Sequence, residues 1–439
     1  MATRFNGEIV NSDAMQMYEG LPIITNKATF EEQQGIPHHL LGFVGLNEEP
    51  WRVGLYKEKA SQIIHEIRER GRLPIVVGGT HYYIQSLLIK DSLVTQQAEG
   101  NGEEVPTGLT NQEIDQSFPI LAGPTSEMIQ KLREVDPIMA DHWHPNDRRK
   151  IRRSLEIFLL TGKKASDIYD AQKEERLQRK TIDPPEEKPV ASETHEVESP
   201  LLFWVHSEPE ALKKRLDSRI LKMIENGLLD EVRSMDKFLR DRLDNGIEVD
   251  RTRGIWVSIG YKEYEQYLNA LATSSKSPSE LSTLFAQAVE QMQAATRQYA
   301  RRQTRWIRLK LMPALSEENI VEKLYLLDGT NLEDWKTSVL KPALDLTELF
   351  LSGEQLPAAT TLSDTAKEIL GGESLNINPT TQIRRECELC HTIVVTEDQW
   401  QSHLKSRAHR RLTKKGLKDM RKGNFAQESS IASVAEETA

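Results

Sequence analysis

Cysteine is scarce in this 439-residue sequence, which has only Cys387 and Cys390, both close to the C-terminus. The body of the chain therefore has no disulfide framework, which favours a reducing, intracellular compartment. Long apolar runs are also lacking, since no stretch approaches the roughly 18 residues that a membrane span requires. The opening residues, MATRFNGEIVNSD, resemble neither a signal peptide nor an Arg-rich presequence. We expect no membrane partner, while cytoplasm, mitochondrion and nucleus all stay open.

An excess of positive charge is lacking as well, because the formal net charge is -10. A negative charge that is spread evenly over the surface argues against a nucleic-acid partner. In this sequence, however, the basic residues are clustered. Residues 147–153 hold five basic residues and one acidic residue, residues 297–310 hold six and none, and residues 381–425 have a net charge of +6. A solvated helix face and a nucleic-acid contact are both open for each of these runs.

Apolar periodicity indicates alternating helices and strands in the first part of the chain. Residues 72–89 predict a buried strand, a Gly-Gly turn and a helix, and residues 54–70 predict the helix before them. At the start, ATRFNG resembles the end of a helix that runs into a strand, EIVNS, as though the chain opens within a domain. This alternation predicts an α/β fold with a parallel sheet.

Composition and periodicity divide the chain into segments with different expected structures. We predict helices over 208–235 and 281–311, and loops where charged, proline-containing sequence replaces apolar residues. The expected segments are an α/β core at 1–123, a helical insertion at 124–171, a disordered insertion at 172–199, a return to the core at 200–350, a linker at 351–382, a separate zinc finger at 383–424 and a disordered tail at 425–439.

The two cysteines belong to a metal-binding pattern, C-x2-C-x12-H-x5-H, formed by Cys387, Cys390, His403 and His409. Two thiolates on a tight turn and two imidazoles on one helix face suit a closed tetrahedral Zn²⁺ site. The wide histidine spacing requires a local adjustment of the helix. We expect neighbouring His391 to be a bystander. The basic helix of the finger suits phosphate contacts.

Seven short motifs follow one another in unbroken order, among them NSDAMQMYEGLPIITNKAT and VVGGTHYYIQSLL. The first is similar to the block N-[AS]-D-S-M-Q-x-Y-x-G-L-x-I-x-T-x-K of tRNA dimethylallyltransferases (tRNA isopentenyltransferases), and the second is similar to the G-G-T-x-x-Y turn of that family. The seven blocks lie at 11–29, 35–43, 76–88, 136–162, 215–232, 258–264 and 296–308. The chain thus resembles this family over residues 5–310, and the added finger is typical of eukaryotic members.

The resemblance implies a P-loop-NTPase-like parallel sheet, truncated at its N-terminus, with a helical insertion. It also implies transfer of a dimethylallyl group from dimethylallyl diphosphate to the exocyclic amine of the adenine 3′ of the anticodon. The implied partners are that diphosphate and the anticodon stem-loop of tRNA, and we expect a monomer. Structural Zn²⁺ is expected in the finger, and Mg²⁺ is implied for the full-length enzyme.

Three residues within these blocks are candidates for the implied chemistry. Asp13 matches the catalytic aspartate, and a carboxylate that takes the proton of the poorly nucleophilic amine accelerates such a reaction by about 10²–10⁴-fold. Thr80 is expected to hydrogen-bond at the reacting centre, and Gln16 to read the edge of the flipped-out base. Without the family, Asp13 and Thr80 are also typical of residues that cap a following helix.

Basic residues supply the expected anion contacts. Three of them resemble the tRNA-contacting block of the family: Arg149, Lys150 and Arg153. Arg215 and Arg219 lie four residues apart on one predicted helix face and serve either the diphosphate or a salt bridge. The predicted basic helix also carries Arg301 and Arg302, which stay unassigned.

A phosphate-binding loop of the form G-x-T-x-x-G-K-[ST], with which family members open, has no match in these 439 residues. We therefore expect this chain alone to be inactive and poorly stable, because the diphosphate lacks its anion site and the sheet lacks a strand. The alternative is a non-catalytic tRNA- or RNA-binding protein with a finger. A finger protein with an unrelated α/β body is disfavoured by the ordered motifs.

Overall fold

The computed structural model describes residues 1–48, 50–89, 111–181, 200–273, 276–371 and 382–413. The chain forms two compact units. One comprises Met1–Leu93 and Pro189–Ile377, and the other comprises Val94–Lys188 and Asn378–Ala439. In the part of the chain that is described, no helix combines the length and apolar character needed to cross a membrane.

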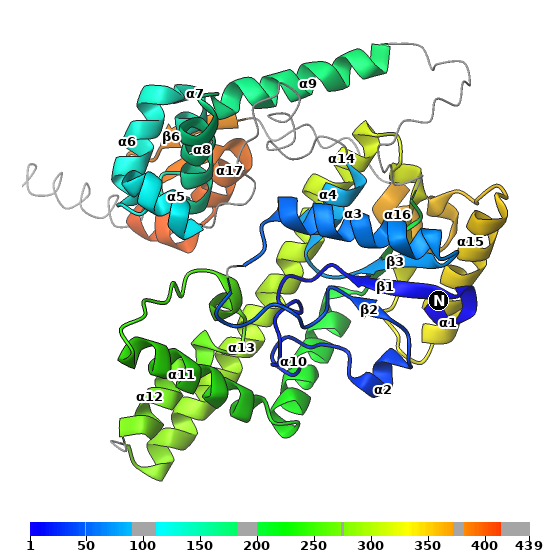
Figure 1. The fold of residues 1–439 in the computed structure, drawn as a ribbon, viewed down its shortest axis with the longest axis horizontal. Coiled ribbons are helices and arrows are strands. Elements are labelled where there is room, and N and C mark those ends of the chain that lie inside the picture. The colour runs from blue at the N-terminus through cyan, green and yellow to red at the C-terminus, as the bar shows by residue number, and fades with distance from the viewer. Residues whose placement is uncertain (49, 90–110, 182–199, 274–275, 372–381, 414–439) are drawn as a thin grey trace, which may run out of the picture. The chain divides into compact units, whose positions relative to one another are not determined.

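A three-stranded parallel sheet lies within the first unit (Figure 1). Its strands, in spatial order, are β2 (His38–His39), β1 (Gly7–Asn11) and β3 (Leu73–Val77). Ile9 of β1 is paired with His38 on one side and Ile75 on the other. This arrangement confirms the predicted parallel α/β architecture.

Four helices accompany these strands, and all but the second were predicted from the sequence. They are α1 (Ala2–Phe5), α2 (Phe30–Gln33), α3 (Val53–Glu69) and α4 (His81–Leu88). Helix α3 packs on the sheet because Tyr56, Ala60, Ile64 and Ile67 recur at helical spacing and are buried in one cluster with Val10 of β1. The start of the chain is the predicted helix end and strand, with Asn6 in a left-handed conformation between them.

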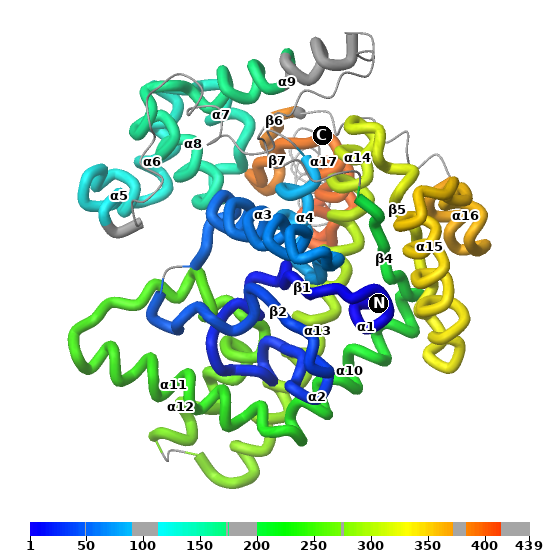
Figure 2. Tube along the Cα trace, turned by 45° about the vertical axis from the view of Figure 1, so that its right-hand side comes forward, coloured from blue at the N-terminus to red at the C-terminus, as the bar shows by residue number. Residues whose placement is uncertain are grey.

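A second parallel pair in the same unit consists of β4 (Leu202–His206) and β5 (Leu324–Asp328) (Figure 2). It is accompanied by α14 (Met312–Glu317), α15 (Lys341–Ser352) and α16 (Asp364–Gly371). The predicted linker at 351–382 therefore contains a packed helix. Ala366 and Leu370 are buried, four residues apart on α16, and Thr365 donates a hydrogen bond to Asp328 at 2.7 Å. Residues 372–381 lie outside the described part.

Four further helices belong to the first unit: α10 (Pro209–Glu225), α11 (Leu228–Asp244), α12 (Glu265–Thr273) and α13 (Pro278–Trp306). The helix predicted over 208–235 is in fact two helices, because Gly227 has a φ of 103°. The predicted long basic helix is confirmed. Ser277 and Glu280 form a capping box at the start of α13, and a π-helical turn, Ile307–Leu311, follows its end.

The second unit contains the helical insertion: α5 (Asn111–Ser117), α6 (Thr125–Val135), α7 (Pro137–His142), α8 (Arg148–Thr161) and α9 (Ala165–Thr181). The insertion starts earlier than residue 124, because Ile114 and Leu121 are buried in the cluster that α6 and α8 form. It also ends later than residue 171, since α9 extends ten residues into the segment predicted to be disordered. Residues 182–199 of that segment are outside the described part.

The finger belongs to this second unit and consists of β6 (Gln382–Glu386), β7 (Ile393–Thr396) and α17 (Glu397–Leu404), followed by helical residues 407–413. It packs against the insertion, contrary to the prediction of a separate small unit. Arg384 lies 3.3 Å from Asp141, and Nε2 of His144 lies 3.0 Å from the Ile393 carbonyl oxygen. Side-chain contacts between distant segments of this kind leave no pattern in the sequence. The tail at 425–439 falls outside the described residues.

Candidate functional site

The carboxyl ends of β1 and β3 lead into two turns that are locked together. The Ser12 N–H donates to the Val77 carbonyl at 2.8 Å, and the Thr80 N–H donates to the Ser12 carbonyl at 3.1 Å. A Cβ atom at Gly78 would lie 2.1 Å from the carbonyl carbon of Ser12, so only glycine allows this approach. The two turns bring the backbone around Asp13 close to Thr80.

Asp13 directly precedes a hydrogen-bonded turn at residues 14–17 and is not followed by a helix. Its Oδ1 accepts a hydrogen bond from the Met15 N–H at 2.9 Å. Burial raises the pKa of this carboxyl, and hydrogen bonds from the backbone N–H groups of Met15, Gln16 and Gly79 act in the opposite direction. The carboxyl group is therefore oriented by its own turn and has a raised proton affinity, as a general base requires.

Thr80 occupies the N-cap position of α4, but its side chain does not cap that helix. Its Oγ1 accepts a hydrogen bond from the Ala14 N–H at 3.0 Å. The hydroxyl proton is thereby left as a donor beside Asp13. The structure thus differs from both simple capping interpretations of Asp13 and Thr80.

Helix α13 adds Tyr299 and Gln303 to this site, and neither was predicted. The amide of Gln303 donates to the Gly79 carbonyl at 3.0 Å. Burial, followed by the negative charge of Asp13, raises the pKa of Tyr299 to about 12, while a hydrogen bond with Gln303 lowers it. The four-residue spacing on a basic helix is the sequence signal that these side chains share a face.

Gln16 is half-buried, and its amide donates to the Asn26 carbonyl at 3.1 Å. The turn that carries Asn26 is fixed by Glu231 of α11, which accepts hydrogen bonds from the N–H groups of Ile23 and Ile24 at 2.9 and 2.7 Å. With its NH₂ group oriented toward Asn26, Gln16 keeps its Oε1 as an acceptor. Its contact with a base stays a prediction.

The two candidate diphosphate residues have different environments. Arg215 donates to the carbonyl oxygens of Gly329 and Thr330 at 2.7 and 3.1 Å, so it ties α10 to the end of β5. Arg219 is exposed and has no partner among the described residues. Desolvation nonetheless lowers the pKa of Arg219, which indicates that its guanidinium group is partly enclosed although the residue is exposed. Arginine stays charged in either case. Arg219 is therefore the better placed of the two to bind an anion.

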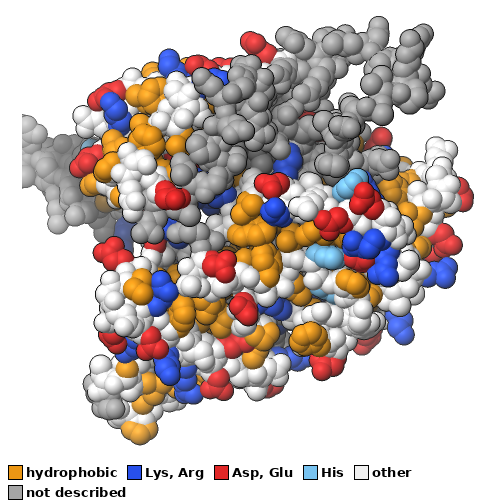
Figure 3. Space-filling view, in the orientation of Figure 1, with side chains coloured by type: hydrophobic (Ala, Val, Ile, Leu, Met, Phe, Trp, Pro, Cys, Tyr) orange, Lys and Arg blue, Asp and Glu red, His pale blue; other side chains and the backbone are white. Residues whose placement is uncertain are grey.

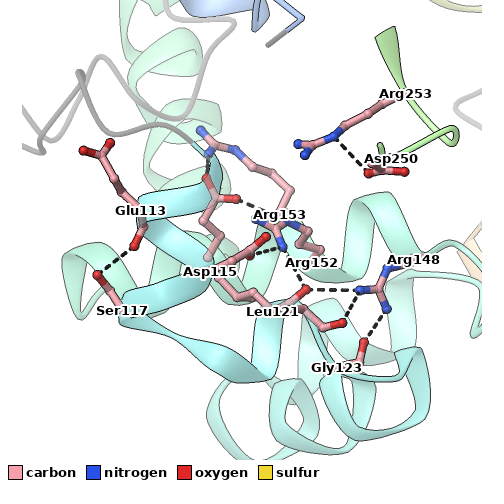
Figure 4. Close-up of polar contacts among 12 residues, drawn as sticks. Glu113, Asp115, Ser117, Leu121, Gly123, Arg148, Arg152, Arg153, Asp250 and Arg253 are labelled. Atoms are coloured by element: carbon pink, nitrogen blue, oxygen red, sulfur yellow. Dashed lines mark hydrogen bonds and ion pairs between the residues drawn. The ribbon is translucent and has the colours of Figure 1, made fainter. Parts of the chain in front are cut away.

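The basic run at 147–153 contains both residues that hold the insertion together and residues that are exposed, and Figure 4 shows the contacts of Arg148, Arg152 and Arg153. Arg152 binds Asp115 at 2.5 Å and the Leu121 carbonyl at 2.8 Å, and Arg148 also donates to Leu121. Among the predicted tRNA contacts, Arg153 lies 2.6 Å from Glu156, Lys150 lies over the Trp143 ring, and Arg149 is exposed without a partner in the described structure. Only part of this run is available to bind an RNA backbone.

Charged side chains elsewhere also pair with one another. On the face shown in Figure 3, acidic and basic side chains of the first unit are interspersed. Helix α11 carries two pairs within its own length, Arg233 with Asp230 at 3.2 Å and Arg240 with Asp236 at 2.7 Å. The distribution of charge, more than its sum, therefore decides which surfaces attract an anion.

The predicted metal ligands converge in the finger. The ligand atoms of Cys387, Cys390, His403 and His409 all lie within 4.8 Å of one another. The Cys390 Sγ lies 3.2 Å from Nε2 of His403 and 3.8 Å from Nδ1 of His409, as tetrahedral Zn²⁺ ligation requires. Residues 405 and 406 interrupt the helix and accommodate the wide histidine spacing. The donor set therefore fits Zn²⁺.

His391 is not one of these ligands. It is exposed, has a φ of 51° and lies 3.1 Å from Glu386. This agrees with the expectation that it is a bystander.

These features define an α/β protein with a carboxylate and a hydroxyl at the carboxyl edge of a parallel sheet, and with an added Cys2His2 finger. A family model described as IPP transferase matches residues 16–310, and one described as a zinc-finger of C2H2 type matches residues 385–409. The chain therefore belongs to the IPP transferase family.

Individual relatives are similar over nearly the whole chain. A tRNA dimethylallyltransferase of Schizosaccharomyces pombe is 33% identical over 423 residues, which cover 93% of this chain and 90% of the relative. One of Homo sapiens is 33% identical over 416 residues, covering 94% and 82%. A solved eukaryotic dimethylallyltransferase acting on tRNA is 30% identical, has a TM-score of 0.71 and covers 98% of this chain and 94% of its own.

Proposed function

We propose that this protein transfers a dimethylallyl group from dimethylallyl diphosphate to the exocyclic amine of the adenine 3′ of the anticodon in tRNA. The observation that carries the proposal is the approach of Asp13 and Thr80 on two interlocked turns, in a chain of this family. The relatives' activity on tRNA supports the choice of substrate.

The proposed reaction forms a bond between the adenine nitrogen and the terminal allylic carbon while the bond from that carbon to the diphosphate oxygen breaks. The diphosphate leaves with the electron pair, and Asp13 accepts a proton from the amine. Oδ2 is the acceptor, because Oδ1 is already engaged by the Met15 N–H. The Thr80 hydroxyl donates a hydrogen bond where negative charge develops.

We propose that tRNA is bound through Arg149, Lys150 and Arg153, with the finger adding affinity, and that Gln16 reads the base edge. Phosphate contacts make such binding sensitive to salt. The exposure of Arg149 supports this role most directly. We further propose an intracellular monomer, to be checked by light scattering and by imaging of a tagged protein.

We propose that Arg219 contacts the diphosphate and that Mg²⁺ is the counter-ion of the diphosphate. Because the sequence contains no G-x4-G-K-[ST] motif, we propose that this chain alone is inactive in the transfer. Strand β3 has a paired neighbour on one side in the described structure, and β4 pairs with β5 alone. Val77, at the end of β3, and Val205, next to the end of β4, are about half exposed.

The test measures transfer of labelled dimethylallyl groups to tRNA by this chain and by a version carrying a phosphate-binding strand, loop and helix of the family pattern. The proposal predicts transfer by the extended protein and none by the shorter one. If the extended protein binds tRNA without transferring the group, the non-catalytic RNA-binding function replaces it.

A further inference from the structure

One face of α13 lies against the two turns that follow β1 and β3, here called the catalytic turns, at Gly79, which has no side chain. A Cβ atom at Gly79 would lie 2.7 Å from Nε2 of Gln303, 3.1 Å from Oδ2 of Asp13 and 3.8 Å from the hydroxyl oxygen of Tyr299. These three polar groups therefore surround a single small space. Glycine at position 79 keeps that space open.

The hydrogen bonds of Gln303 determine what the Tyr299 hydroxyl can do. The amide nitrogen of Gln303 has two protons, of which one binds the Gly79 carbonyl at 3.0 Å. The Gln303 amide also lies close enough to Tyr299 to lower the pKa of the phenol by hydrogen bonding. A phenol oxygen that accepts this bond directs its own proton elsewhere, and Oδ2 of Asp13 is an anionic acceptor beside the same open position at Gly79.

We propose that Tyr299 is a positioning residue whose hydroxyl donates a hydrogen bond to Oδ2 of Asp13 across Gly79, with Gln303 as its anchor. The carboxylate is then fixed at both oxygens, by the Met15 N–H at Oδ1 and by Tyr299 at Oδ2. A carboxylate oxygen has a second lone pair, so Oδ2 still accepts a proton from the substrate amine. The catalytic meaning of this contact rests on the proposed function.

The protonation state of Tyr299 suits a donor, since its pKa of about 12 keeps the phenol neutral at physiological pH. The described structure has no hydrogen bond between Tyr299 and Asp13. The pKa of Asp13 is raised by burial and lowered by hydrogen bonds from backbone N–H groups. The inference is therefore that the two groups close on each other over the open space at Gly79.

Other titratable or charged groups near these turns are directed elsewhere or exposed. Burial lowers the pKa of His81, which follows Thr80, so this imidazole is neutral at physiological pH. Tyr56 of α3 donates to the Asn11 carbonyl at 3.2 Å. Arg301 and Arg302 lie on α13 and are exposed. Tyr299 is thus the side-chain donor that faces Asp13 from α13.

The direct test follows the Asp13 carboxyl by ¹³C NMR with labelled aspartate, using Asp13→Asn to assign its signal. Loss of a donor to a carboxylate favours the protonated form, so the midpoint should move to higher pH in Tyr299→Phe. Tyr82→Phe is the matched control, because Tyr82 packs edge-on against Trp306. The midpoint of the Asp13 carboxyl in this variant should equal that of the wild-type protein. An unchanged midpoint in Tyr299→Phe overturns the inference. This readout needs no turnover, so it stands apart from the proposed transfer.

The kinetic test uses the extended protein that transfers the group. In Tyr299→Phe, kcat should fall about tenfold, the acidic limb of the pH profile should move to higher pH, and the KM for tRNA should stay unchanged. Gln303→Leu, which removes the anchor and leaves both other groups in place, should act in the same direction. A raised KM with an unmoved pH profile would assign Tyr299 to tRNA packing and contradict the proposal.

Discussion

Gly78 is the residue on which the geometry of the catalytic turns depends. Gly78→Ala should destabilise the protein by about 1–3 kcal/mol, because the new methyl group meets the Ser12 backbone and not a movable side chain. Urea unfolding measures the change. Gly371→Ala is the control, since its nearest contact is at an ordinary 3.5 Å. Equal stability of the two variants would show that the turns are not tightly opposed.

Glu8 gives the protein a defined acid sensitivity. This buried carboxylate binds Arg70 at 2.9 Å, Arg72 at 3.1 Å and His39 at 2.6 Å. A hydrogen bond from Arg70, opposed by burial and aided by His39, lowers its pKa from 4.5 to about 2. The contribution to stability is therefore complete above pH 4.5 and lost as the pH falls toward 2.

Replacement of Glu8 by Gln should remove that part of the pH dependence. At pH 7 we expect a loss of about 1–3 kcal/mol, limited by the solvent exposure of the arginines. Between pH 3 and pH 7, the free energy of unfolding should change less with pH for Glu8→Gln than for the wild-type protein. Parallel curves would contradict the assignment.

At the scale of elements, periodicity predicts most of the first unit. The strand, Gly-Gly turn and helix at 72–89 and the long basic helix are present as expected. Composition was a poorer guide, because α9 and α16 occupy segments that are rich in polar residues. Two apolar residues one turn apart, Ala366 and Leu370, are enough to bury α16, and that pattern is too short to distinguish from a linker.

Helix α8 separates two functions of arginine within one basic run. Arg149→Ala should weaken tRNA binding and reduce the salt slope by about one, with stability unchanged, because the side chain is exposed. Arg152→Ala should instead destabilise the insertion, since Arg152 holds Asp115 and the Leu121 carbonyl. Binding at several salt concentrations, together with thermal melting, distinguishes them. Identical effects of the two variants would contradict this division.

At the scale of the whole molecule, the association of the finger with the insertion was not predictable. The ligand spacing identifies the metal site, but the contacts of Arg384 with Asp141 and of His144 with Ile393 join residues over two hundred positions apart. For the same reason Tyr299 and Gln303 were missed, since their neighbours Asp13 and Gly79 are distant in sequence. Periodicity assigns a residue to a face without naming what that face meets.

Removal of the metal should unfold the finger while the first unit stays folded, because metal binding supplies most of the folding energy of so short a segment. Cys387→Ser should lose zinc, measured by mass spectrometry, and lower tRNA affinity without abolishing transfer. His391→Ala, which alters an exposed neighbour outside the ligand set, should keep both. Unchanged tRNA binding by Cys387→Ser would exclude the finger from tRNA recognition.

The central claim is that Asp13 is the general base of a group transfer to tRNA, and Asp13→Asn tests it most directly. Asparagine keeps an oxygen for the Met15 N–H, so the turn should persist. In the extended protein we predict that transfer falls about 10²–10⁴-fold while tRNA affinity and thermal stability stay at wild-type values. Transfer at the wild-type rate by Asp13→Asn would contradict the account.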